Sequence, residues 1–331
     1  MAYAPAVNTY ADRAGNSLDH VAVTFYKKSG LDRLEKNFRH GMLGEPDSLP
    51  LRSGQTVQWF RYNNLASNTS AATEGAVGTS VTIASDTISA SVSQYADFAN
   101  FSDLLVETAI DPMVTNGSEL MGYRLGLSVD TLIRTEIESV NSSVDEDTVG
   151  SYFSASDLRK ARSLLQAADV QPMEGGYFRA LCSPYVTYDL VNDPTAGGFT
   201  DLTKWIEPSR TQEAADRGLI GRIGGVELWE STNVATSGSA PNTKYHVTVA
   251  GRGALGVVDL AGRGVTGFAM MNTPPSQMPI NVIPGELSIA NPMGTVGAAV
   301  SYNVKFVAKL LRTGSDDYRF RIFEADSSIA S

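Results

Sequence analysis

Few side chains of this sequence are suited to catalysis or metal binding. Its 331 residues include one cysteine, Cys182, and three histidines, which stand far apart at His20, His40 and His246. A disulfide needs a second cysteine, and a structural zinc site needs about four clustered cysteine or histidine ligands. The sequence therefore predicts no disulfide within the chain and no metal site of this kind.

These four side chains have structural explanations. Cys182 lies in a strand-like run, and the nearest cation, Arg179, would point to the opposite face, so a buried and unreactive thiol is expected. The histidines are expected in a first helical turn, at a helix end and in a strand, for His20, His40 and His246 respectively. Acidic clusters at 145–147 and 316–317 stand in polar, turn-like stretches, which favours solvated loops over acid–base catalysis.

One glycine motif imitates a cofactor site. Residues 251–256, GRGALG, spell the fingerprint of a dinucleotide-binding turn, which requires a helix of some length and an acidic residue about 20 positions further on. Here only Asp259 is near, and the next residues, VDLAGRGVTG, would end a helix early. A tight packed turn is the expectation. The phosphate-binding loop, the HExxH helix and the nucleophile elbow do not occur, so no catalytic residue and no cofactor are predicted.

Composition and charge point to a folded protein with little affinity for DNA or lipid. The chain is 42% hydrophobic and 19% charged, and its 26 basic and 36 acidic residues give a net charge of −10. A protein that grips duplex DNA makes roughly 6–10 cationic contacts with phosphates, and no cluster of basic residues could supply them. No apolar run approaches the ~20 residues of a membrane span, and no signal peptide pattern opens the chain.

The first third of the chain alternates helical and extended patterns. Helical spacing covers 16–42, and prolines make 44–51 an extended strap. A strand is expected over 54–65, with bulky side chains on both faces that should both meet protein. The residues from 66 to 100 alternate weakly, as a return strand would. They contain too few large apolar residues to fold alone, so this excursion must pack against another surface.

Helices dominate the next segment. A short helix is expected over 103–110. A long helix should follow and run to about Asn141, with Asp111 as its cap and Pro112 as its first residue. About thirty residues would span about 45 Å. Its apolar stripe consists of Leu120, Met121, Leu125, Val129, Leu132, Ile133, Ile137 and Val140. After an acidic turn, a further helix over 154–169 should open with a serine cap.

The second half predicts a mixed sheet with few helices and tight glycine turns between 218 and 267. Strands are expected at 177–190, 224–232, 244–250 and 265–272, and a terminal β-pair at 299–311 and 318–325. The fold class is therefore α+β.

The order of these segments resembles that of the major capsid proteins of tailed bacteriophages, and specifically of coat proteins similar to those of N4-type phages. The matching stretches, which span nearly the whole chain in family order, are GQTVQWFRYNNL with Glu74-Gly75, SVSQYADFANFSDLL, YFRALCSPYVTYDL, Trp205 with GLIGRIGG and VELWES, and GTVGAAVSYNVKFVAKLL with YRFRIFEA.

This resemblance implies a phage major capsid fold. Its parts would be an N-terminal arm at 1–50, an extended β-hairpin loop at 51–100, a peripheral domain with a long spine helix at 101–153, a glycine-rich axial domain at 154–290, and a terminal β-pair at 291–331 that returns to the peripheral domain. Contacts between subunits are expected from Trp59, Arg61 and Glu74 in the loop and from Phe25 and Phe38 in the arm.

The function implied is that of a structural coat protein, not an enzyme, which self-assembles into an icosahedral shell around double-stranded phage DNA. Its partners would be further copies in hexamers and pentamers, scaffolding, portal and decoration proteins, and DNA through weak nonspecific contact, without a membrane. Assembly would take place in the host cytoplasm, and the product would be the virion capsid. The sequence leaves two alternatives open: an α/β enzyme with an unrecognised active site, and a β-rich binding or adhesion module.

Overall fold

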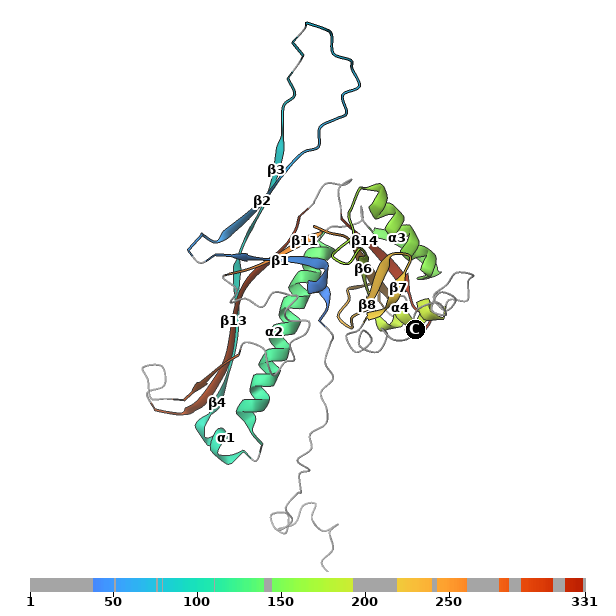
Figure 1. Ribbon diagram of the computed structural model, residues 1–331. Coiled ribbons are helices and arrows are strands. Elements are labelled where there is room, and N and C mark those ends of the chain that lie inside the picture. Colours follow the sequence, from blue (N-terminus) through green and yellow to red (C-terminus); the bar gives the residue numbers. More distant parts are fainter. Residues whose placement is uncertain are drawn as a thin grey trace, which may run out of the picture. The chain divides into compact units, whose positions relative to one another are not determined.

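The computed structural model of the chain is shown in Figure 1. It describes residues 38–50, 52–75, 77–78, 80–109, 111–139, 145–192, 219–239, 243–260, 280–285, 293–311 and 319–329. All of them belong to the second of two compact units, Glu35–Ser331. Most of the helix expected over 16–42, the strand expected over 265–272, and Asp316 and Asp317 lie outside the described residues.

A five-stranded sheet is built around one long strand. Its members are β1 (Gly44–Leu49), β4 (Ser93–Ser102), β11 (Leu255–Leu260), β12 (Asn281–Pro284) and the fifteen-residue β13 (Val296–Leu310). β13 pairs antiparallel with β4, β11 and β12, and β1 pairs parallel with β11. Along β13, Val304 and Phe306 are buried while Asn303 and Lys305 are exposed, so this sheet has one core face and one solvent face.

The predicted long helix is confirmed as α2, Met113–Glu138, which packs against β13 (Figure 1). Its buried apolar positions are Met121, Leu125, Val129, Ile133 and Ile137, in steps of four. Leu120 was expected in this stripe but is 52% exposed, because it lies beside the stripe and not on it. None of the described helices is both long and apolar enough to cross a bilayer.

The start of α2 differs from the expected cap. Pro112 is the N-cap residue instead of the first helical residue, and no side chain caps this end. Asp111 contributes its backbone carbonyl, which accepts the N–H of Met113. The short helix before it, α1 (Asp103–Thr108), is confirmed, and the hydroxyl of Ser102 accepts the N–H of Leu105 there.

A seven-stranded mixed sheet forms the second layer of strands. In order its main path is β5 (Asp145–Tyr152), β14 (Phe320–Asp326), β10 (Lys244–Ala250), β6 (Phe178–Cys182), β8 (Val226–Glu230) and β7 (Leu219–Ile223), with β9 (Thr236–Ser237) beside β10. Two of its pairings, β5 with β14 and β6 with β8, are parallel. The mixed sheet expected in the second half is thus confirmed.

Helices α3 (Ala155–Ala167) and α4 (Pro184–Val191) belong to the second half as well. Ser154 is the N-cap residue of α3, as predicted, and the Asp157 carboxylate accepts the N–H of Ser154 at 2.9 Å and its hydroxyl at 2.7 Å. Buried apolar residues of α3 and α4, such as Leu158, Leu165 and Leu190, share one hydrophobic core with Phe178 and Phe323 of the sheet.

Three sequence predictions about strands are wrong. The strand expected over 177–190 ends at Cys182, because Pro184 cannot donate to a ladder and instead opens α4 in its first turn. The acidic turn expected after α2 is the strand β5, which lies at the edge of its sheet, where charged sequences are tolerated. The expected terminal β-pair does not form, since β13 and β14 lie in different sheets.

The burial of β14 explains why it does not pair with β13. Phe320 and Ile322 belong to the core around α2, whereas Phe323 and Ala325 belong to the core around α3. A strand buried on both faces suits the interior of a covered sheet, whereas β13 exposes one of its faces.

The excursion expected at 51–100 is a hairpin. β2 (Thr56–Tyr62) and β3 (Ser85–Ser91) pair antiparallel as a separate two-stranded sheet, and a long loop joins them (Figure 1). The return strand begins later than the sequence indicated, so that Val81 and Ile83 are loop residues, each 67% exposed. After Val92 the chain continues as β4 into the five-stranded sheet.

Candidate functional site: an exposed aromatic face and a buried junction

Strand β2 presents two different faces. Val57, Trp59 and Arg61 are partly buried, whereas the alternate residues are exposed. Phe60 is 69% exposed and Tyr62 is 68% exposed, and their rings meet edge to face with centroids 6.2 Å apart. Across the hairpin, Thr87 stands opposite Phe60 and Ser85 stands opposite Tyr62. Two aromatic rings therefore project from a strand pair of otherwise small and polar neighbours.

Large exposed aromatic side chains are the residues that most often anchor protein interfaces. We call Phe60 and Tyr62 the aromatic face of the hairpin. The sequence analysis expected both faces of this strand to meet protein but named contact residues only on the other side, because alternation alone could not show which side the chain itself covers.

The predicted contact residues are spread over separate places. Trp59 packs closely against β11. A Cβ added to Gly256 of this strand would lie 3.0 Å from the Cζ2 atom of Trp59. Arg61 forms an ion pair with Asp86 at 3.4 Å on the neighbouring strand. Glu74 is exposed in a turn of the loop, and Phe38 packs against α2. Phe25 lies outside the described residues.

A second exposed apolar area lies on the solvent face of the five-stranded sheet. Phe98 on β4 is 66% exposed and Ile283 on β12 is 55% exposed. Phe98 pairs with Ser301, and Ile283 pairs with Ala299, two positions earlier on β13. Because alternate residues of a strand share a face, both side chains emerge on the same side of this sheet.

A buried polar network joins α2 to the segments before β1 and after β8. The Asp130 carboxylate on α2 accepts the backbone N–H of His40 at 2.9 Å, and its Oδ2 lies 2.9 Å from His40 Nδ1. The same oxygen accepts Asn233 Nδ2–H at 2.7 Å. Arg134, one turn along α2, donates to the backbone carbonyl of Asn233 at 2.9 Å.

Asp130 is charged within this network although it is only 4% exposed. Burial alone would raise its pKa, but the charge of His40 and the hydrogen bonds from His40 and Asn233 outweigh burial and hold the pKa below the usual value. His40 was expected at a helix end facing the dipole. It is instead the first residue of a short 3-10 turn, η2 (His40–Leu43), and is paired with a carboxylate.

The remaining candidates from the sequence have structural surroundings. His246 lies in strand β10 as expected, with Nδ1 2.7 Å from Glu138 of α2 and Nε2 3.5 Å from Glu324 of β14. Cys182 is fully buried, as expected, and burial raises the pKa of its thiol to about 12. This thiol therefore stays protonated at neutral pH, which removes its value as a nucleophile.

The first four residues of the GRGALG motif form a turn between β10 and β11, as expected, and the last two begin β11, so that no helix starts here. Gly253 has a φ of +69°, and a Cβ at Gly251 would lie 2.5 Å from Val170. Conformation and close packing thus account for these two glycines.

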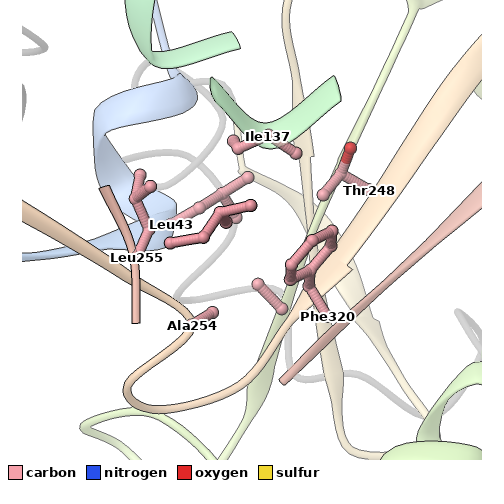
Figure 2. A pocket seen from close by; sticks show the side chains of 8 residues that line it. Leu43, Ile137, Thr248, Ala254, Leu255 and Phe320 are labelled. Atoms are coloured by element: carbon pink, nitrogen blue, oxygen red, sulfur yellow. The ribbon is translucent and has the colours of Figure 1, made fainter. Parts of the chain in front are cut away.

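The cavity in Figure 2 is far too small for a substrate. Its volume is about 10 Å³, which leaves room for about one water molecule. It is lined by Leu43, Ile137, Thr248, Ala250, Ala254, Leu255, Leu310 and Phe320. Among the residues that the structure describes, no three histidine, cysteine, aspartate or glutamate side chains gather as metal ligands would.

Comparison with solved structures decides the fold. The capsid protein of Ralstonia phage GP4 matches with a TM-score of 0.65 and 12% identity, over 98% of this chain and 99% of its own. The capsid protein of cyanophage P-SCSP1u matches with a TM-score of 0.61 and 15% identity, over 97% of this chain and 100% of its own. This chain has a phage capsid fold.

The phage capsid fold accounts for nearly the whole chain and not for one sheet of it. Cyanophage Pam1 provides a third match, with a TM-score of 0.64 and 12% identity, over 92% of this chain and 97% of the capsid chain. Sequence comparison adds nothing to this, since no protein-family model and no curated protein matches. The two sheets, α2 and the hairpin are therefore parts of one known architecture.

Proposed function

We propose that this chain is the major capsid protein of a tailed phage, of the kind found in N4-like phages. It would self-assemble into an icosahedral shell that encloses double-stranded DNA. The observation that carries this proposal is the likeness to phage capsid proteins over nearly the full length of both chains. An enzyme or a binding module would not be expected to match three separate phage capsids over nearly their full length.

The exposed aromatic face supports assembly. A two-stranded hairpin has little stability of its own in water, and this one exposes Phe60 and Tyr62 where they contribute nothing to its own core. A neighbouring copy would supply the missing burial. Head-to-tail contacts of this kind close into rings, as hexamers and pentamers require.

The proposed division into parts follows the resemblance of the sequence. Residues 1–50 form the arm, 51–100 the extended loop, 101–153 the peripheral domain with α2 as spine helix, and 154–290 the axial domain. Sheet membership cuts across these bounds, because β5 and β14 lie in the seven-stranded sheet, whereas β11 and β12 lie in the five-stranded sheet with β13.

The proposed partners are other copies of this chain, together with scaffolding, portal and decoration proteins. The proposed location is the virion capsid, after assembly in the host cytoplasm. The contacts between subunits would include the aromatic face, in addition to the Trp59, Arg61 and Glu74 predicted from the sequence and the arm residues Phe25 and Phe38.

The size of the assembly separates this proposal from its alternatives. A coat protein forms very large closed particles, whereas an enzyme or an adhesion module forms a monomer or a small oligomer. Electron microscopy of the expressed full chain, with its scaffold partner where one is required, tests the proposal.

We expect the isolated subunit to bind duplex DNA too weakly to measure at physiological salt. A net charge of −10 per subunit repels the phosphate backbone on average. A gel-shift titration at about 0.15 M salt measures this directly. Saturable binding with a micromolar or lower Kd would contradict the expectation and would show that folding gathers basic residues into a patch.

A further inference from the structure

The segment that leads into β1 contacts three different parts of the fold within six residues. We call residues 38–43 the junction segment. Its first three side chains, Phe38, Arg39 and His40, each contact a different residue or network, and its last two, Met42 and Leu43, are only 1% exposed.

Phe38 occupies a notch on α2. Gly126 makes this notch, since a Cβ added there would lie 2.6 Å from the Phe38 ring. The ring also packs against Tyr123, with centroids 5.5 Å apart. Next to it, the Arg39 guanidinium lies 5.7 Å from the centre of the Trp229 ring on β8, a cation–π contact with the seven-stranded sheet.

His40 also links α2 to the segment that follows β8, through the carboxylate of Asp130. Asp130 of α2 accepts from His40 and from Asn233, which follows β8. Exposed fractions are 3% for His40, 4% for Asp130 and 2% for Asn233, so the network is cut off from water. If His40 were removed, the charge of Asp130 would stay buried with fewer partners, which is costly.

The rest of the junction segment extends these contacts. Arg179 of β6 donates to the carbonyl of Met42 at 2.8 Å. Leu43 lines the small cavity together with Ile137 of α2 and Phe320 of β14, as Figure 2 shows. This cavity lies where α2, both sheets and the junction segment meet. Side chains therefore leave a small gap at the place where the junction segment packs against the rest of the fold.

We propose that the junction segment controls how tightly the seven-stranded sheet is held against α2. Undocking Phe38, Arg39 and His40 loosens this sheet from the helix and leaves the packing between α2 and β13 intact. Displacement of the junction segment therefore reaches the seven-stranded sheet through Asp130 and Asn233. This inference concerns the single subunit and does not depend on assembly.

Hydrogen–deuterium exchange on the unassembled full-length subunit tests the proposal. The informative peptides cover residues 226–237 and 128–138, and the reference peptides cover the β4–β13 ladder. His40→Ala should speed exchange in the informative peptides by about tenfold or more, because a charge-assisted network is lost, and should leave the reference unchanged. Ser128→Ala is the matched control, because that hydroxyl donates to the Arg124 carbonyl of the same helix at 2.7 Å.

A second pair of variants shows whether His40 acts through Asp130. The double variant His40→Ala with Asp130→Asn should exchange no faster than the faster single variant, since both break one network. If His40→Ala does not fold, Phe38→Leu tests the same docking through the Gly126 notch. Unchanged exchange at 226–237 would overturn the proposal, and so would an equal increase in the β4–β13 reference, which would indicate general destabilisation.

Discussion

Replacing Phe60 and Tyr62 together by serine should leave the subunit folded and stop it from assembling. Both rings are about two-thirds exposed and contribute almost nothing to the chain's own core. The thermal midpoint should therefore change little, as exposed substitutions alter stability by about 0.5 kcal/mol or less. At an interface, each aromatic anchor contributes about 2 kcal/mol or more, so the pair should weaken association by roughly a thousandfold.

Sedimentation velocity and a thermal melt of the same sample measure the two effects together. Thr87→Ala is the matched control, because Thr87 stands directly opposite Phe60 on the exposed face and has no aromatic ring. This control should assemble normally. Normal particles from the double variant would remove the aromatic face from the proposed contacts, and loss of the cooperative melt would show that the two rings stabilise the subunit itself.

Asp130→Asn should lower the free energy of unfolding at pH 7 by about 2–4 kcal/mol, because several buried donors lose a charged acceptor. An asparagine presents an amide N–H₂ to groups that already donate, namely His40 N–H and Asn233 Nδ2–H. At least one buried donor then lacks an acceptor, which adds to the lost charge interaction.

The difference between the two proteins should depend on pH. The pKa of Asp130 is lowered in the folded protein, so its contribution to stability is complete above the usual aspartate value of about 4 and disappears as pH falls through the folded value. Denaturant unfolding at pH 7, 5, 4 and 3 should show the gap between wild type and Asp130→Asn closing only in the acid range. Glu107→Gln, which alters an exposed carboxylate of α1, provides the control. A gap that stays constant down to pH 3 would contradict the assignment of a buried, charged Asp130.

The successful predictions rest on strong hydrophobic periodicity and on known local chemistry. The apolar stripe of α2 is continuous for many turns, so its helix could be located from Met121, Leu125, Val129 and Ile133 alone. Cys182 and the GRGALG turn were placed correctly because a single motif without its structural context is weak evidence of chemistry.

The errors arose where tertiary structure overrides local pattern. The segment after Cys182 contains Pro184 with Val186 and Leu190 at helical spacing, but the preceding strand pattern masked this signal. β13 and β14 are adjacent in sequence and look like a hairpin, yet only the burial of β14 on both faces shows that it belongs inside another sheet.

The candidate site was the least predictable part. Trp59 and Phe60 are neighbours on one strand, and which of them faces the chain's own core depends on Gly256, nearly two hundred positions away. The network of His40, Asp130 and Asn233 likewise joins residues that are 90 and 103 positions apart. Pairings at such separations leave no trace in a single sequence.

Electron microscopy of the expressed full-length protein, with a scaffold protein added where one is required, tests the central claim most directly. The proposed function predicts closed shells of uniform size in which subunits are arranged as hexamers and pentamers. A monodisperse monomer or small oligomer at every protein and salt concentration examined would contradict it, and would favour an enzyme or a binding module built on a phage capsid fold.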